Sequence, residues 1–205
     1  MLRIALLLVL ASAEALTLGS RTLTVRNRCR GASASAATAP LLAALADSGP
    51  VGVDAAEDVQ AQIELLACEL EGKGEDDAQA RVPLSGTYDL LYSMAKGGSN
   101  GKVGPFVGAV SQIIVNDQDF INQVSLFGGA LVVQLHAKRE VIGDNAIRVE
   151  FVETVFSLFG NEVKRQPTSG KGVWKQLFVQ RGADGSAALR VMRTPSLFVL
   201  RQRAA

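Results

Sequence analysis

Residues 119–160 read DFINQVSLFGGALVVQLHAKREVIGDNAIRVEFVETVFSLFG. Three runs rich in β-branched and aromatic residues are separated by Gly128-Gly129 and by Gly143-Asp144-Asn145. Such runs, bounded by turn-forming residues, predict three β-strands. The connections are too short for the crossovers that parallel strands need, so the strands should pair antiparallel.

The same pattern continues on both sides of this stretch. Further strands are expected over residues 86–94, 108–116, 172–180, 186–192 and 196–202, which brings the number of predicted strands to eight. Eight strands joined in a meander close well into a barrel with room for side chains or one small ligand. The sequence therefore predicts a mainly β chain, with an eight-stranded antiparallel barrel in residues 81–203.

Many of the predicted strands are apolar on both faces. Within residues 145–159, Ile147, Val149 and Phe151 share one face, and Val152 and Phe156 lie on the other. A free-standing barrel in water should alternate more cleanly between apolar and polar positions. One face should therefore fill the lumen, and the other should meet a helix, a partner or lipid.

A short α-helical segment and linker should precede the barrel in residues 40–80. A helix is expected over residues 54–72, because apolar residues recur there at helical spacing, namely at Val59, Ile63, Leu66, Ala67 and Leu70. Asp54 and Glu57 have the spacing of a capping box at its start. A shorter helix is expected from Pro40 to Ser48, and a charged linker over residues 73–81.

The N-terminus has the features of a presequence. Residues 1–16 combine Arg3, a short apolar run and a small-residue cleavage motif, Ala11-Ser12-Ala13, which indicates a signal peptide. Residues 17–39 are rich in Ser, Thr, Ala and Arg and contain no acidic residue, which is typical of an organelle transit peptide. This combination predicts import into a complex plastid with extra membranes; the alternative is a secreted protein with a basic propeptide.

The charge of the remaining chain excludes some partners. Residues 1–39 contain five of the 21 Lys and Arg and one of the 20 Asp and Glu, which leaves 16 basic and 19 acidic residues, a net charge near −3. A mildly acidic protein is a poor partner for nucleic acid. Outside the N-terminal apolar run, no stretch approaches the roughly 20 apolar residues of a membrane-spanning helix. Cys68 is then the only thiol.

The sequence offers no recognisable catalytic, metal or cofactor motif. The glycine-rich stretch at residues 97–101 lacks the Lys-Ser/Thr that a phosphate-binding loop requires. The chain has a single histidine, His136, in an apolar run, and two cysteines, so no Cys/His zinc site is expected. We therefore predict a non-catalytic protein without a cofactor.

Three stretches carry a resemblance to a known family. Residues 84–93, LSGTYDLLYS, resemble the first strand of the plastid lipid-associated proteins (plastid fibrillins or plastoglobulins), with Tyr88 in the place of the usual Trp. Residues 104–112 with Phe120-Ile121-Asn122 are similar to the region of its second strand. Residues 189–193 and 197–200, LRVMR and LFVL, are similar to its terminal signature. The resemblance covers about residues 40–203.

This resemblance implies a lipocalin-like barrel in a plastid (chloroplast), with peripheral association to plastoglobules or thylakoids. The implied partners are neutral, prenyl or acyl lipids such as prenylquinones and carotenoids. No catalytic centre is implied.

Candidate site residues follow from strand parity. The residues expected to line the lumen are Tyr88, Leu90, Tyr92, Ile114, Phe120, Val133, Leu135, Phe151, Trp174 and Phe198. Arg190 and Arg193 have opposite parity and should face opposite sides of the barrel. One of them could bind a lipid head group at the barrel mouth, because a guanidinium pairs well with a carboxylate; the alternative is a salt bridge to a neighbour such as Glu150.

Three functions remain open at this point. The first is a non-catalytic protein that docks on a lipid surface, with the apolar exterior, the loop aromatics Phe106 and Phe159 and basic residues making the contact. The second is a soluble carrier of one prenylquinone, carotenoid or acyl lipid, which requires a lumen cavity of several hundred Å³. The third is a lipid-modifying enzyme that uses His136 or Arg193.

Overall fold

The computed structural model describes residues 34–204 except 75, 96–99 and 104. Its barrel strands are β1 (Thr87–Ser93), β4 (Ala109–Ile114), β5 (Asp119–Leu126), β6 (Leu131–Val141), β7 (Ala146–Leu158), β8 (Asn161–Arg181), β9 (Ala187–Arg193) and β10 (Leu197–Gln202). The helices are α2 (Ala34–Ala46) and α3 (Glu57–Leu70), with short 3-10 turns η1 (Pro50–Gly52), η2 (Gln79–Arg81) and η4 (Phe127–Gly129).

The eight long strands form a closed antiparallel barrel in the order β1-β10-β9-β8-β7-β6-β5-β4. The last strand closes the barrel against the first, and Tyr88 pairs with Gln202. The predicted architecture, a mainly β chain with an eight-stranded antiparallel barrel after two short helices, is therefore confirmed.

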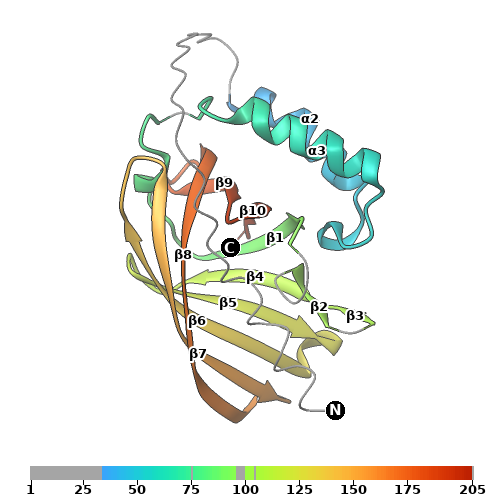
Figure 1. Ribbon diagram of the computed structural model, residues 1–205, viewed down its shortest axis with the longest axis vertical. Helices are drawn as coiled ribbons and strands as arrows, with labels where there is room; N and C mark the ends of the chain where they lie inside the picture. Colours follow the sequence, from blue (N-terminus) through green and yellow to red (C-terminus); the bar gives the residue numbers. More distant parts are fainter. Residues whose placement is uncertain (1–33, 75, 96–99, 104, 205) are drawn as a thin grey trace.

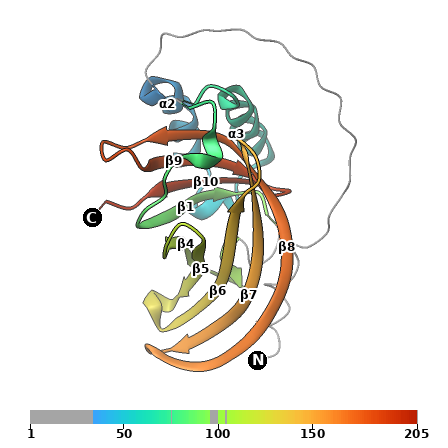
Figure 2. The same ribbon diagram turned by 90° about the vertical axis from the view of Figure 1, so that its left-hand side faces the viewer.

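The two helices lie together over one side of the barrel (Figures 1 and 2). They bury the outer faces of β1, β10, β9 and β8 in a first core whose members include Leu41, Ile63, Val191 and Val199. The sequence predicted that the apolar outer face of the strands meets a helix, a partner or lipid. On these four strands it meets the helices. Burial of such aliphatic side chains contributes about 1.5–3 kcal/mol each.

The lumen forms the second part of the core. Its two clusters contain Tyr88, Leu200 and Met192 from the capped side and Phe120 and Val149 from the opposite side. The segment after α3 closes one end of the barrel, because Ala80 and Val82 are buried in these clusters. We call residues 76–84 the plug. Its backbone is tied to the β6–β7 turn by a hydrogen bond from Ala80 N to Asp144 O of 2.7 Å.

Four details differ from the sequence-based expectations. Helix α2 begins at Ala34, with Pro40 inside it, rather than at residue 40. Helix α3 has Ala56 at its N-cap with no side-chain cap, and Asp54 instead lies 3.3 Å from Lys102, so the capping-box prediction is wrong. Strand β8 starts eleven residues before the expected position 172. A small ladder, β2 (Lys102–Val103) with β3 (Phe106–Val107), occupies the glycine-rich connection.

Candidate functional site

Exposed apolar side chains lie at both ends of the barrel, and the exposed phenylalanines of the described residues lie at one of them. Because neighbouring strands run antiparallel, the β1–β4 connection, the β5–β6 turn and the β7–β8 turn all lie at this end (Figure 1). Among the exposed large apolar residues on these connections are Phe106, Val107, Phe127, Leu158 and Phe159. We call these five residues the apolar rim.

Parts of the rim contact one another. The rings of Phe106 and Phe127 meet edge to face with centroids 4.8 Å apart. A hydrogen bond of 2.8 Å from Phe159 N to Ala130 O joins the β7–β8 turn to the β5–β6 turn. Phe127 and Phe159 are 59% and 75% exposed, which is costly in water and unusual for phenylalanines that share one end of a molecule.

Both exposed turns hold an aromatic residue in a strained backbone conformation. Leu158 pairs with Asn161, so Phe159-Gly160 is a two-residue hairpin loop, and both residues have positive φ, 48° and 81°. That is a type I′ turn, which favours Asn-Gly because a bulky residue pays about 1–2 kcal/mol for the left-handed region. Phe127 has φ 52° ahead of Gly128 at 66°. A phenylalanine at the apex of each turn therefore lowers stability while it presents a ring to the outside.

Sequence reasoning found part of the rim. Phe106 and Phe159 were expected as loop aromatics, whereas Phe127 was assigned to the end of a strand. Strand β5 ends at Leu126, and Phe127 begins the turn. The dipeptide Phe-Gly, which occurs at both turns, was the signal that could have identified it.

The lumen brings together nine of the ten predicted lumen candidates. Tyr88, Leu90, Ile114, Trp174 and Phe198 share one lumen cluster, and Phe120 and Phe151 join Trp174 in the other. The ring of Trp174 lies 5.6 Å from that of Phe120 and 6.5 Å from that of Phe151, measured between centroids. Val133 and Leu135 precede Ala137 at alternate positions on β6 and share its inward face.

Tyr92 lies elsewhere. The register of β1 against β10 shifts between Leu90 and Tyr92, so that Tyr92 pairs with Val199, whose side chain faces the helices. Tyr92 is fully buried in that helix-facing core, and a Cβ on Gly52 would overlap its ring. The bulge reverses the parity that placed Tyr92 in the lumen.

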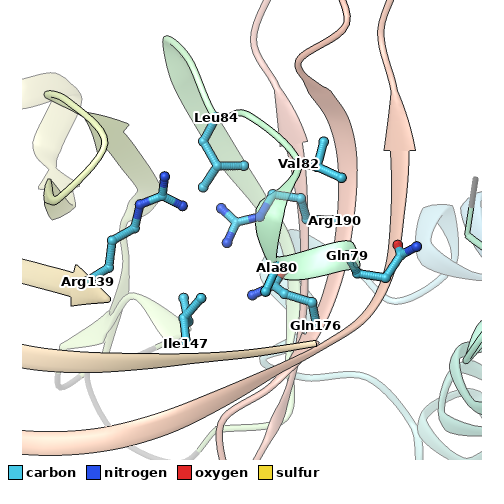
Figure 3. A pocket seen from close by; sticks show the side chains of 8 residues that line it. All are labelled: Gln79, Ala80, Val82, Leu84, Arg139, Ile147, Gln176 and Arg190. Carbon is cyan, nitrogen blue, oxygen red and sulfur yellow. The ribbon is translucent and has the colours of Figure 1, made fainter. Parts of the chain in front are cut away.

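The lumen side chains leave little space. The cavity next to Arg190 measures about 10 Å³, room for about one water molecule, and is lined by Gln79, Ala80, Val82, Leu84, Arg139, Ile147, Gln176 and Arg190 (Figure 3). A lipid carrier needs a cavity of about 300–1,000 Å³. The cavity next to Arg190 is far smaller than that, so it gives the carrier hypothesis no support.

Arg190 points into the lumen, and its side chain is the largest that is fully buried. Its Nη1 donates to Gln112 Oε1 at 2.6 Å, and its guanidinium lies 5.3 Å from the ring centroid of Tyr88. Burial lowers the pKa of Arg190 to about 10. No salt bridge joins it to a carboxylate of the described residues, and Glu150 instead pairs with Lys171.

Arg193 and His136 lie on the outside of the barrel. Arg193 forms an ion pair with Glu64 of α3, which joins the helical cap to β9. His136 faces outward from β6, with Nδ1 3.8 Å from Glu153 Oε1, and Glu153 is also held by Arg165. Neither side chain reaches the lumen, so the two groups suggested for catalysis are not brought together with the lumen candidates.

Among the described residues, no group of three His, Cys, Asp or Glu could hold a metal ion. No helix in the described part of the chain is long and apolar enough to cross a membrane.

These features define a class: a small antiparallel barrel with apolar clusters in its lumen, a helical cap on one side and an apolar rim at one end. The PAP_fibrillin family model matches residues 35–192, most of the chain. The chain therefore belongs to the PAP_fibrillin family, the plastid lipid-associated proteins. Searches of curated proteins and of solved structures found no match.

Proposed function

We propose that this protein is a non-catalytic plastid protein that docks through its apolar rim on the lipid surface of plastoglobules or thylakoids. The observation that carries the proposal is the pair of strained Phe-Gly turns at one end of the barrel. Two phenylalanines in unfavourable backbone conformations lower the stability of the fold, and burial of their rings in lipid would offset that loss. Membership in a family of lipid-associated proteins supports the same function.

The energy of such docking comes from the rim itself. Transfer of one exposed phenylalanine side chain into an apolar phase contributes about 1.5–3 kcal/mol. Phe106, Phe127 and Phe159 together would suffice for reversible binding to neutral, prenyl or acyl lipids. Surface salt bridges such as Arg165 with Glu162 lie on the adjoining part of β8 and remain in water.

A double substitution tests this function, because it should weaken lipid binding without lowering the stability of the fold. Phe127→Asn and Phe159→Asn place a residue that tolerates positive φ at both turns, so the free energy of unfolding should stay equal or rise by about 1 kcal/mol. Loss of two lipid-buried rings should weaken binding to a neutral-lipid emulsion by at least about a hundredfold. Flotation measures binding, and urea unfolding measures stability.

The matched control is Ile142→Asn. Ile142 is also exposed, at 40%, but lies in the β6–β7 turn at the opposite end of the barrel. This variant should float like the wild type. If the double variant floats unchanged, the rim does not mediate docking and the proposal fails.

We also propose that the presequence ends before helix α2. Thr38 is buried and its hydroxyl lies 3.4 Å from Gln180 Oε1, which indicates that residues from Ala34 onward belong to the fold. Signal and transit segments would then occupy about residues 1–33 and direct the chain to a complex plastid. N-terminal sequencing of the protein from its own plastids should find a start between residues 15 and 34; a start after Leu41 would contradict this.

A further inference from the structure

A second candidate site lies inside the barrel, beside the plug and away from the rim. Its centre is the cavity between Arg139 on β6 and Arg190 on β9. In Figure 3 the two guanidinium groups point toward each other across this space, with Leu84 on one side and Ile147 on the other. None of the eight residues that line the cavity is acidic.

Arg190 is held in place but its charge is not matched. Its polar partners are Gln112 Oε1, at 2.6 Å, and Met192 Sδ, at 3.6 Å from Nη2, and neither is charged. Gln112 is itself fixed, because its Nε2 donates to Asn122 Oδ1 at 3.1 Å. The Nε of Arg190 is buried without a hydrogen-bond partner. A buried cation normally keeps a counter-ion, since the desolvation cost is large.

Arg139 supplies a second positive charge from the opposite wall. Its Nε donates to the carbonyl oxygen of Asp117 at 2.8 Å, which leaves the remainder of the guanidinium toward the cavity. Burial lowers the pKa of Arg139, and the charge of Asp117 opposes that shift. Two cations that face one space form an electropositive site, and its natural ligand is an anion.

We propose that this cavity binds a carboxylate, with Arg190 as the fixed donor and Arg139 as the donor at the entrance. A carboxylate between the two groups would accept from the guanidinium of Arg190 and from that of Arg139, and its single negative charge would offset one of their two positive charges. The cavity of about 10 Å³ holds about one water molecule, so a carboxylate enters only when the partly buried side chain of Arg139 moves outward. The apolar walls, Val82, Leu84 and Ile147, suit the carbon atoms next to it.

The carboxylate has two possible sources, a small soluble acid or the head of an acidic lipid. Arg139 is only partly buried, so its side chain can move to widen the entrance for an acyl chain. The site lies at the plug end, whereas the rim lies at the other end of the barrel. The proposal is thus independent of the proposed docking function, and separate variants can remove each one.

Trp174 provides a built-in reporter for the experiment. It is the only tryptophan of the chain, and it packs in one cluster with Ala80 and Ile147, which line the cavity. Purified protein from residue 34 to 205 is titrated with sodium acetate or sodium octanoate at constant ionic strength set with sodium chloride. Trp174 emission and the thermal unfolding midpoint are recorded for the wild type, Arg139→Gln, Arg190→Met and the exterior control Arg148→Gln.

We expect a saturable change in emission and a rise in the unfolding midpoint with at least one carboxylate. Arg139→Gln should weaken binding at least tenfold, Arg190→Met should abolish saturation, and Arg148→Gln should leave it unchanged. Much tighter binding of octanoate identifies a lipid acid as the source, and equal binding identifies a small acid. Absence of a saturable response to both salts, or an unchanged response in Arg139→Gln, overturns the proposal. The Phe127→Asn, Phe159→Asn double variant should retain carboxylate binding.

Discussion

Two tyrosines on β1 show how differently the same side chain can be used. Tyr88 and Tyr92 are both fully buried, but they lie on opposite sides of the barrel wall. The hydroxyl of Tyr88 donates to Ala187 O at 2.7 Å and ties β1 to the start of β9. The hydroxyl of Tyr92 is buried without a hydrogen-bond partner, near Glu64, and burial raises its pKa.

These environments predict opposite effects of removing the hydroxyl group. Tyr88→Phe should lower the free energy of unfolding by about 1–3 kcal/mol, because the buried carbonyl of Ala187 loses its partner. Tyr92→Phe should raise the free energy of unfolding by about 1 kcal/mol, because it removes a buried hydroxyl group that has no hydrogen-bond partner. Urea unfolding of both variants measures the difference. Equal destabilisation by the two substitutions would contradict this account of Tyr92.

The strands could be predicted from the sequence, but the residues that face the lumen could not be predicted on every strand. Alternation correctly assigned Phe120, Trp174 and Phe198 to the lumen because the pleat is regular around them. It failed at Tyr92 because a bulge at Leu91 shifts the register, and bulges leave no clear mark in a single sequence. Similar shifts occur near Val152 and Leu177.

The polar start of β8 was missed for a related reason. Residues 161–171 contain Pro167, Gly170 and several charges, and so lack the apolar alternation of a strand. Their pairing comes from the adjoining strand β7, which is strongly predicted over its whole length. The two-arginine cavity could not be predicted either, because Arg139 and Arg190 are 51 positions apart and meet only when the barrel closes.

At the scale of elements, ion pairs of Asp76 with Arg181 and of Arg81 with Asp144, together with a few hydrogen bonds, hold the plug. Arg181 of β8 donates to Asp76 with Nε–Oδ2 2.7 Å and Nη2–Oδ1 3.0 Å. Gln79 accepts from Val179 N at 2.5 Å. These contacts fasten residues 76–79 to β8 at the same end as the two-arginine cavity.

The ion pair between Arg181 and Asp76 should weaken at low pH. The hydrogen bond from Arg181 holds the pKa of Asp76 below its ordinary value of 3.8. A carboxylate with a lowered pKa stabilises the fold fully above the unfolded value, and this contribution disappears as the pH falls through the folded pKa. Between pH 5 and about 3, the wild type should therefore lose more stability than Asp76→Asn. Parallel loss in both proteins, measured by urea unfolding, would contradict this role of Asp76.

At the scale of the whole molecule, the apolar surfaces of the helices and of the rim have different roles. The apolar faces of α2 and α3 are used on the barrel, where they cover β1, β10, β9 and β8. They are therefore unavailable for lipid without unfolding of the first core. The rim remains as an exposed apolar region at one end, and the plug with its cavity occupies the other.

The central claim is that the rim end, and not the plug end, enters the lipid. The most direct measurement places one tryptophan at each end in a Trp174→Phe background: Phe159→Trp at the rim, or Ile142→Trp in the β6–β7 turn. Emission is recorded on emulsions of neutral lipid that carry a brominated quencher. We expect a blue shift and quenching for Phe159→Trp alone. Quenching of Ile142→Trp with Phe159→Trp unaffected, or of neither, would contradict docking through the rim.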